Sequence, residues 1–223
     1  MRIILNTTPA TTPVPFDYQA KMVGCIHKWI GERNLLHDTI SLYSFSWLKD
    51  GKAEAKAKAL SFPKGATFFI SFYDDSVIKT IIQAILNEPA MFCGMTVSDV
   101  TLADYPDFDH RDYFYCGSPI FIKRRMADGS IKQYNYLDAE AGLLLTETLK
   151  SKMRRAGLDE DKTLGIHFDT SFDKKKLKLV RYHGINNKAS MCPVVITGKA
   201  ETKRFAWDVG IGNCTGIGMG SIY

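Results

Sequence analysis

Histidine is the residue type in this sequence best suited to acid–base chemistry, because its ordinary pKa of about 6.5 lies close to neutral pH. The chain of 223 residues contains five histidines. His37 is followed by Asp38, whose carboxylate could orient the ring. His27 lies earlier, in a stretch of helical periodicity, where a half-buried structural role is an equal alternative. His37 and His27 are therefore candidates for catalysis, although from the residues alone a histidine of a surface loop is the more common interpretation of His37.

The remaining histidines are weaker candidates, and nothing in the sequence predicts a metal site. His110 lies in an acidic stretch, which indicates a solvated side chain, while His167 and His183 lie in or beside expected strands. The five cysteines are odd in number, widely separated and without a CxxC pair, so neither a disulfide framework nor a zinc site is expected. We expect that the protein needs neither a metal nor a cofactor.

The last stretch of the chain, residues 210–220, has a second pattern that could bind a ligand. Five of its eleven positions are glycine. Glycine adopts positive φ angles readily and lets another backbone approach closely. Such a run can form a loop whose N–H groups cradle phosphate, or a tight packing device between neighbouring segments.

Positive charge is concentrated in the second half of the chain. Residues 1–110 carry 10 Lys and Arg against 12 Asp and Glu, whereas residues 111–223 carry 19 against 12. A polyanion is the natural partner of such a half. The helix dipole or a solvated face also explains some of these charges. The candidate contacts are Arg124 and Arg125 on an expected hairpin, Arg154 and Arg155 at a helix end, and Lys174 and Lys175 in a lysine run.

Composition indicates a soluble globular protein of the cytoplasm. Hydrophobic residues make up 45% of the chain, which is enough for a core. No apolar run approaches the ~20 residues that a membrane-spanning helix needs, and the N-terminal residues lack the layout of a signal peptide. Scattered unpaired cysteines agree with a reducing compartment.

The first half shows the order strand, helix, strand, strand, helix, strand. Apolar residues alternate in the expected strands and recur every three or four positions in the expected helices. Asp74 or Asp75 is the expected cap of the second helix. The strands are expected at 2–5, 41–48, 66–73 and 92–102, and the helices at 18–31 and up to residue 87.

The second half repeats this order after an acidic linker at residues 103–112. Asp128-Gly129 marks a hairpin turn, Asp138 caps the following helix, and Gly157 ends it. Further elements are expected at 119–125, 131–136, 165–168, 177–182, 191–197 and 201–209, with a last strand after the glycine run. We therefore predict an α+β protein of two tandem ferredoxin-like (βαββαβ) domains, residues 1–105 and 113–223.

Two such halves with a C-terminal glycine-rich loop resemble the RAMP superfamily of CRISPR-associated proteins, whose fold is also RRM-like. Within it, the chain is similar to the repeat-processing endoribonucleases of the Cas-six type. Residues 210–212 and 216–219 resemble the family's Gly-hydrophobic-Gly, spacer, Gly-Phe-Gly pattern, with a spacer of three residues and Ile217 in the usual aromatic position. The first helix followed by Leu36-His37, and Ser118-Pro119-Ile120 before a basic hairpin, are further similarities.

The resemblance implies metal-independent cleavage of CRISPR repeat RNA (pre-crRNA). The ribose 2′-OH attacks the adjacent phosphate and leaves a 2′,3′-cyclic phosphate and a 5′-OH. It implies His37 as the catalytic residue in the first domain, with His27 second. Together with the basic residues, Gly210, Gly212, Gly216 and Gly218 would contact RNA. The family's supporting lysine has no aligned position, which leaves Lys28, Lys49 and Lys52 as candidates.

Two alternatives remain open at the level of sequence. One is a non-catalytic RAMP subunit that binds crRNA within a CRISPR effector complex, which needs the fold and the loop but no histidine after the first helix. The other is a ferredoxin-like regulatory or ligand-binding protein in which the loop only packs. Other effector subunits and a second copy of the chain are further candidate partners.

Overall fold

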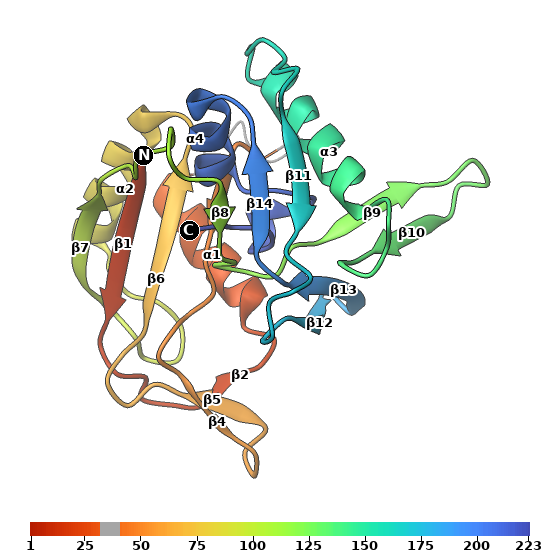
Figure 1. Ribbon diagram of the computed structural model, residues 1–223. Helices are drawn as coiled ribbons and strands as arrows, with labels where there is room; N and C mark the ends of the chain where they lie inside the picture. Colours follow the sequence, from red (N-terminus) through yellow and green to blue (C-terminus); the bar gives the residue numbers. More distant parts are fainter. Residues whose placement is uncertain (32–40) are drawn as a thin grey trace.

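The computed structural model describes residues 1–31 and 41–223 (Figure 1). The first half forms an antiparallel sheet in the order β3-β6-β1-β7. This is the order of a ferredoxin-like βαββαβ unit, with the first strand in the interior of the sheet. The strands are β1 Arg2–Thr7, β3 Tyr43–Phe45, β6 Thr67–Phe72 and β7 Val97–Ala103.

Helices α1 (Gln19–Ile30) and α2 (Asp75–Asn87) supply the layer that covers this sheet. Their apolar residues recur every three or four positions and are buried with Ile3 and Leu5 of β1. Asp74 caps α2 as predicted, because its carboxylate accepts a hydrogen bond from the Ser76 amide at 2.9 Å. The buried helix residues are Met22, Ile26 and Trp29 of α1, and Ile78, Ile81 and Ile85 of α2.

The second half repeats the order of the first. Its sheet runs β11-β14-β8, and the C-terminal segment lies beside β8, where Tyr115 and Tyr223 exchange two backbone hydrogen bonds of 2.9 Å. The prediction of a last strand is wrong in extent, since only a bridge between Cys116 and Ile222 forms. The elements are β8 Tyr113–Phe114, α3 Ala141–Arg155, β11 Gly165–Phe168, β14 Val194–Thr197 and α4 Ala200–Val209.

Two hairpins are inserted into the second unit, one before α3 and one before β14. The sequence predicted the first hairpin, but it predicted a single strand over 191–197 where the structure has two. Pro193 separates β13 from β14, because proline has no N–H to donate to a ladder. The hairpins are β9 Ile122–Arg125 with β10 Ile131–Tyr134, and β12 Lys176–Tyr182 with β13 Ile185–Met191.

The expected cap of α3 is also different from the observed one. Asp138 accepts hydrogen bonds from the backbone and side chain of Asn135, at 2.7 and 2.9 Å, and the helix begins three residues later at Ala141. A small separate sheet in the first half was not expected at all. It has the order β2-β5-β4, with β2 Val14–Pro15, β4 Lys52–Glu54 and β5 Ala59–Ser61.

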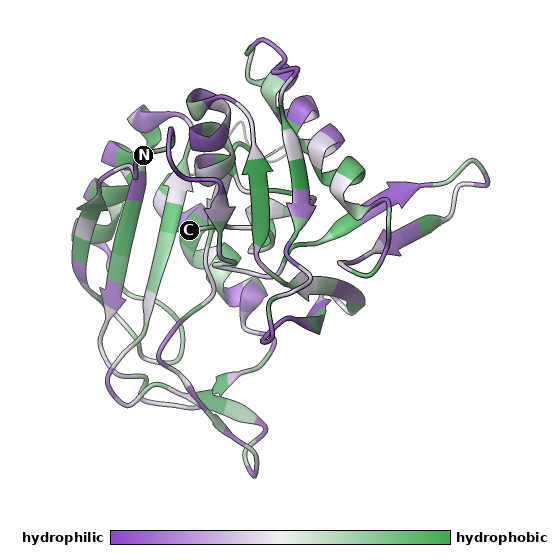
Figure 2. Cartoon of the chain, in the orientation of Figure 1, coloured by the Kyte–Doolittle hydropathy of each residue, from purple (hydrophilic) through white to green (hydrophobic). Residues whose placement is uncertain are grey.

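Each half has its own apolar core, and the hydropathy colouring shows it as green along β1, β6 and β14 (Figure 2). The connector after β7 packs on the second core, where Tyr105 and Phe108 lie 5.4 and 6.1 Å from the ring of Trp207. The domain division at 105 and 113 remains a prediction. In the described part of the chain, no helix has the length and apolarity needed to span a membrane.

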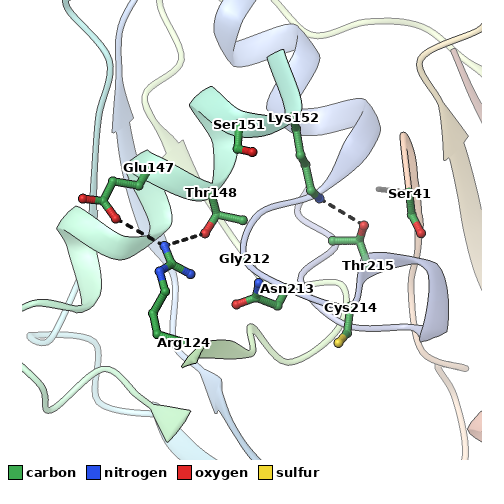
Figure 3. Close-up of a pocket in the computed structure, with 10 residues that line it drawn as sticks. All are labelled: Ser41, Arg124, Glu147, Thr148, Ser151, Lys152, Gly212, Asn213, Cys214 and Thr215. Carbon is green, nitrogen blue, oxygen red and sulfur yellow. Dashed lines mark hydrogen bonds and ion pairs between the residues drawn. The ribbon is translucent and has the colours of Figure 1, made fainter. Parts of the chain in front are cut away.

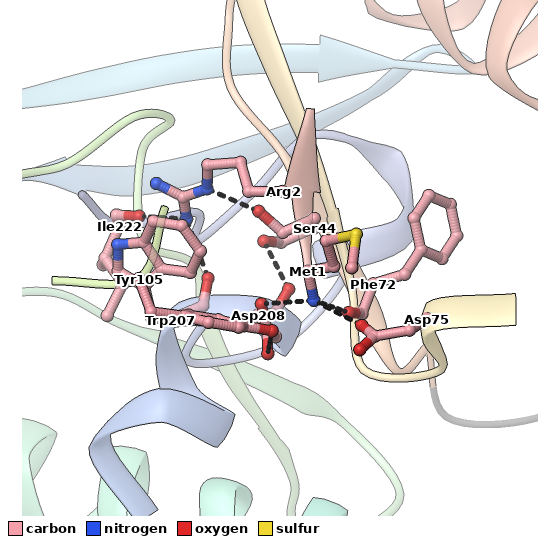
Figure 4. Close-up of polar contacts among 10 residues, drawn as sticks. Met1, Arg2, Ser44, Phe72, Asp75, Tyr105, Trp207, Asp208 and Ile222 are labelled. Carbon is pink, nitrogen blue, oxygen red and sulfur yellow. Dashed lines mark hydrogen bonds and ion pairs between the residues drawn. The ribbon is translucent and has the colours of Figure 1, made fainter. Parts of the chain in front are cut away.

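Arg2 joins the two halves at a buried seam (Figure 4). Its guanidinium donates to Ser71 Oγ of the first half at 2.6 Å, and to the carbonyls of Trp207 and Ile222 of the second at 2.8 and 2.7 Å. The same group stacks between the rings of Phe69 and Trp207. Nearby, the Met1 nitrogen and the Tyr105 hydroxyl donate to Asp208 of α4. The halves are therefore held at a fixed orientation.

Candidate functional site

The glycine-rich loop, residues 210–220, lies in the seam between the halves. Six of its amides donate to backbone carbonyls of the protein, and three of these bonds are 2.8 Å long: Ile211 donates to Gly220, Asn213 to Phe121 and Gly220 to Pro119. The loop therefore closes on itself and on the segment that leads into β9. Cys214, at its turn, has φ 64° and starts a short 3₁₀ turn at Thr215–Ile217.

Glycine is required where this loop meets β3 of the first half. A Cβ at Gly218, which has φ 82°, would lie 2.7 Å from the ring of Phe45. A Cβ at Gly216 would collide with Ser41 Oγ and lie 3.0 Å from the hydroxyl of Tyr43. Gly210 and Gly212 are equally enclosed, the first against Ser44 and the second against the Phe121 carbonyl. All four glycines allow close packing, and their contact with RNA remains a prediction.

A pocket of about 500 Å³ lies on one side of the loop, and we call it the histidine pocket. Both halves of the chain contribute to it. Its side chains with functional groups are His27 of α1, Ser41, Tyr43 of β3, Tyr182 and His183 of the β12–β13 hairpin, and Cys214 of the loop. The turn of the second-half hairpin thus reaches the helix that carries His27.

A hydrogen-bond chain fixes His27 in this pocket. The Tyr43 hydroxyl donates to the carbonyl of Gly216 at 3.2 Å, and His27 Nε2 lies 3.3 Å from the same hydroxyl. Because a carbonyl only accepts, the Tyr43 proton points to Gly216, and the Tyr43 oxygen is left to accept from His27 Nε2–H. Nδ1 is then the proton acceptor of a neutral His27 ring, which is the form that a general base requires.

The phenols and the thiol of the histidine pocket are held neutral near neutral pH. Burial raises the pKa of Tyr43 to about 12 and also raises the pKa of Tyr182. Burial raises the pKa of the Cys214 thiol as well, although Lys123 and Lys152 act in the opposite direction. No carboxylate, lysine or arginine is among the described residues that line this pocket. Histidine is therefore the only residue type there that can carry charge near neutral pH.

A second pocket of about 500 Å³ also has Cys214 in its lining, and we call it the lysine pocket (Figure 3). Lys152 of α3 is 3% exposed and donates to the carbonyls of Val209 and Gly210 and to Thr215 Oγ1, at 3.0, 3.1 and 3.0 Å. Burial lowers the pKa of Lys152 to about 7, while Cys214 acts to raise it. All three ammonium protons bind the base of the glycine-rich loop.

Arg124 enters the lysine pocket from β9 and is held by α3. Its guanidinium donates to the Leu144 carbonyl at 2.7 Å and to Thr148 Oγ1 at 3.0 Å, and it lies 3.5 Å from Glu147 (Figure 3). Ser41 and Cys214 line both pockets. The two pockets are therefore neighbours that meet at the loop turn.

The structure brings only some of the predicted site residues together. His27 and Gly216 share the histidine pocket, and Arg124 and Gly212 share the lysine pocket. His37 lies outside the described residues. The remaining basic residues lie elsewhere: Arg125 and Arg155 are exposed, Arg154 pairs with Glu160 at 3.0 Å, Lys174 lines a pocket with Tyr223, and Lys175 donates to the Phe172 carbonyl.

None of the three candidates for a supporting lysine lines the histidine pocket. Lys28 donates to Glu88 and to the Ala90 carbonyl, Lys49 lies over the ring of Tyr223, and Lys52 is exposed on β4. Two further histidines also lie away from it. His110 pairs with Asp107, whose hydrogen bond raises the His110 pKa, and His167 is exposed on β11.

Two features of these pockets were not predicted from the sequence. Lys152 follows Leu145 and Leu149 on the apolar face of α3, and a lysine in that stripe signals a buried role rather than a surface charge. His183-Gly184 forms a two-residue turn with φ 46° and 79° between paired strands. That dipeptide between two runs of strand-forming residues is a hairpin signal, although nothing in it indicates what the hairpin touches.

Comparison with known families identifies the chain. Residues 103–223 match the model of the family described as CRISPR associated protein Cas6, C-terminal. The chain belongs to the Cas6 family. No curated protein matches the sequence.

Solved structures extend the Cas6-like fold to the first half. The product of a Cas6-related gene from Pyrococcus furiosus has a TM-score of 0.87 at 20% identity, over 100% of this chain and 97% of that one. A RAMP protein described as binding different RNA substrates has a TM-score of 0.83 at 18% identity, over 100% and 98%. A Cas6 product complex has a TM-score of 0.69 at 11% identity, over 99% and 98%.

The predicted fold of two ferredoxin-like units is therefore confirmed, and so is the resemblance to RAMP proteins. Cas6 membership gives the chain a role in processing or binding CRISPR repeat RNA. The glycine-rich loop, which lies within the matched residues, contributes to the lining of both pockets.

Proposed function

We propose that the protein is a metal-independent endoribonuclease that cleaves CRISPR repeat RNA in the histidine pocket. The observation that carries this proposal is the chain from His27 through Tyr43 to the Gly216 carbonyl, since it orients an imidazole toward a pocket beside the glycine-rich loop. The Cas6 product complex, which has the same fold, agrees with it.

His27 acts as the base that takes the proton of the ribose 2′-OH. The 2′-oxygen attacks the adjacent phosphorus, the bond from phosphorus to the 5′-oxygen breaks, and the products are a 2′,3′-cyclic phosphate and a 5′-OH. His37, assigned from the family resemblance, donates a proton to the leaving 5′-oxygen. A positioned acid or base contributes roughly 10²–10⁴-fold to such a reaction.

RNA phosphates lie along the glycine-rich loop and the basic residues of the second half. Arg125, which is exposed on β9, is the first of these contacts, whereas Arg124 on the same strand is held by α3 and lines the lysine pocket. Phosphate contacts of this kind give affinity that depends on salt but carries little sequence information.

The test is cleavage of end-labelled repeat RNA, transcribed from the CRISPR array of the same genome, by pure protein in EDTA. We expect a single cut that leaves a cyclic phosphate. His37→Ala and His27→Ala should each slow the cut by at least about 100-fold and change RNA affinity by less than a few-fold. His167→Ala, on exposed β11, is the matched control and should cut normally.

Two results would contradict the assignment. Undiminished cutting by His37→Ala and His27→Ala would place the chemistry elsewhere. Tight binding of uncut repeat RNA by the wild-type protein would instead favour a non-catalytic subunit that binds crRNA.

A further inference from the structure

The cleavage reaction needs a third function that the residues assigned so far do not supply. As the 2′-oxygen attacks, negative charge accumulates on the non-bridging oxygens of the phosphorane, and a cationic hydrogen-bond donor stabilises them. Lys28, Lys49 and Lys52 are all engaged or exposed away from the histidine pocket. Lys152 of α3 is a further candidate, but its ammonium group already donates to the Val209 and Gly210 carbonyls and to Thr215 Oγ1.

The β12–β13 hairpin places one further side chain of suitable chemistry in the histidine pocket. His183 lines this pocket together with His27, and it comes from the other half of the chain. The turn is anchored, because Tyr182 packs on the apolar core of the first half and its ring contacts the His183 ring at 4.4 Å. His183 is itself exposed, so an RNA phosphate can reach it.

The groups that line the pocket with His183 carry no negative charge near neutral pH. The titratable groups that line the pocket with it are His27, Tyr43, Tyr182 and Cys214. The two phenols and the thiol are neutral near neutral pH, and no carboxylate among the described lining residues competes for an imidazolium. In the proposed reaction His27 is the base and enters the step as a neutral ring.

We propose that His183 is the cationic hydrogen-bond donor that stabilises the phosphorane during cleavage of the repeat RNA. This inference rests on the proposed function above. The proton of His183 is not transferred: the 2′-OH proton goes to His27, the 5′-oxygen takes a proton from the acid, and the protonated His183 ring donates to a non-bridging oxygen throughout.

Three variants test the role under single-turnover conditions in EDTA. His183→Gln keeps a hydrogen-bond donor but has no charge, and it should cut about 100-fold more slowly with RNA affinity within two-fold of wild type. His183→Lys restores a cation and should recover activity to within about ten-fold. His167→Gln is the matched control, because His167 is equally exposed but lies on β11.

The pH–rate profile separates charge from mere position. The ratio of the His183→Lys rate to the wild-type rate should rise at least ten-fold from neutral to alkaline pH, because lysine stays charged to about pH 10 whereas an imidazole does not, and loss of the proton from the acid slows both proteins equally. A purely structural turn residue would not move the profile in this way.

The results distinguish failure of this inference from failure of the proposed function. Wild-type protein that never cuts repeat RNA would overturn both. Active wild type with His183→Gln cutting at the same rate, or with a slow His183→Gln that His183→Lys does not rescue, would overturn the role of His183 alone.

Discussion

The histidine pocket and the lysine pocket meet at one turn of the glycine-rich loop, yet they use their charged groups in opposite ways. In the lysine pocket, Lys152 and Arg124 donate their hydrogen bonds to backbone carbonyls and hydroxyls of the protein itself. In the histidine pocket, lysine and arginine are absent from the described lining, and the imidazoles face a cavity open to a substrate.

The charged groups of the lysine pocket stabilise the fold, whereas the imidazoles of the histidine pocket are available to a substrate. A lysine buried without a carboxylate is costly, and it is retained where backbone carbonyls have no other donor. Here these carbonyls belong to Val209 and Gly210, at the end of α4 and the start of the glycine-rich loop. Lys152 of the lysine pocket therefore stabilises the glycine-rich loop, and the surface of that loop forms part of the histidine pocket.

The strongest test of this separation is Lys152→Met. The substitution keeps the volume of the side chain but leaves the Val209 and Gly210 carbonyls without their donor, so we expect the free energy of unfolding to fall by about 3 kcal/mol. Lys150→Met, whose side chain is 25% exposed and 4.0 Å from Glu160, should cost less than about 1 kcal/mol. Urea unfolding measures both.

Well below its unfolding midpoint, Lys152→Met should still cut repeat RNA within about five-fold of wild type. Loss of cutting in a folded Lys152→Met protein would place Lys152 in the chemistry.

The pH dependence of stability sharpens the same contrast. In the folded protein Lys152 loses its proton near pH 7, whereas in the unfolded chain lysine holds it to about pH 10.4. Between these values the unfolded state binds more protons, so raising the pH favours the folded state. The stability of wild type minus that of Lys152→Met should therefore grow by about 2 kcal/mol between about pH 7.5 and pH 9. A flat difference would mean that Lys152 stays charged in the folded protein, as an exposed lysine does.

The sequence was sufficient for the parts of this comparison that depend on local pattern. Periodic burial of Met22, Ile26 and Trp29 predicted α1, and glycines at fixed spacing predicted the loop. Neither pocket could be predicted, because each is formed by segments that only the tertiary fold brings together. Tyr43 and Gly216 meet across 173 positions, and His183 reaches α1 through a hairpin whose second strand was not recognised. The order of residue types along the chain does not show which distant residues will come into contact.

The neighbouring arginines of β9 give the smallest and most specific test, because they differ in what already binds them. Arg124 donates to Leu144 and Thr148 and pairs with Glu147, whereas the exposed Arg125 has no side-chain partner among the described residues. If phosphate contacts need an uncommitted cation, Arg125→Gln should weaken RNA binding about three-fold and reduce the slope of log affinity against log salt by about 0.7. Arg124→Gln should leave that slope unchanged and instead lower the free energy of unfolding by about 1 kcal/mol.

Filter binding from low to moderate salt, with urea unfolding of the same proteins, measures both effects. The reverse pattern would show that the lysine pocket grips RNA directly, and that its charged groups do more than build the loop.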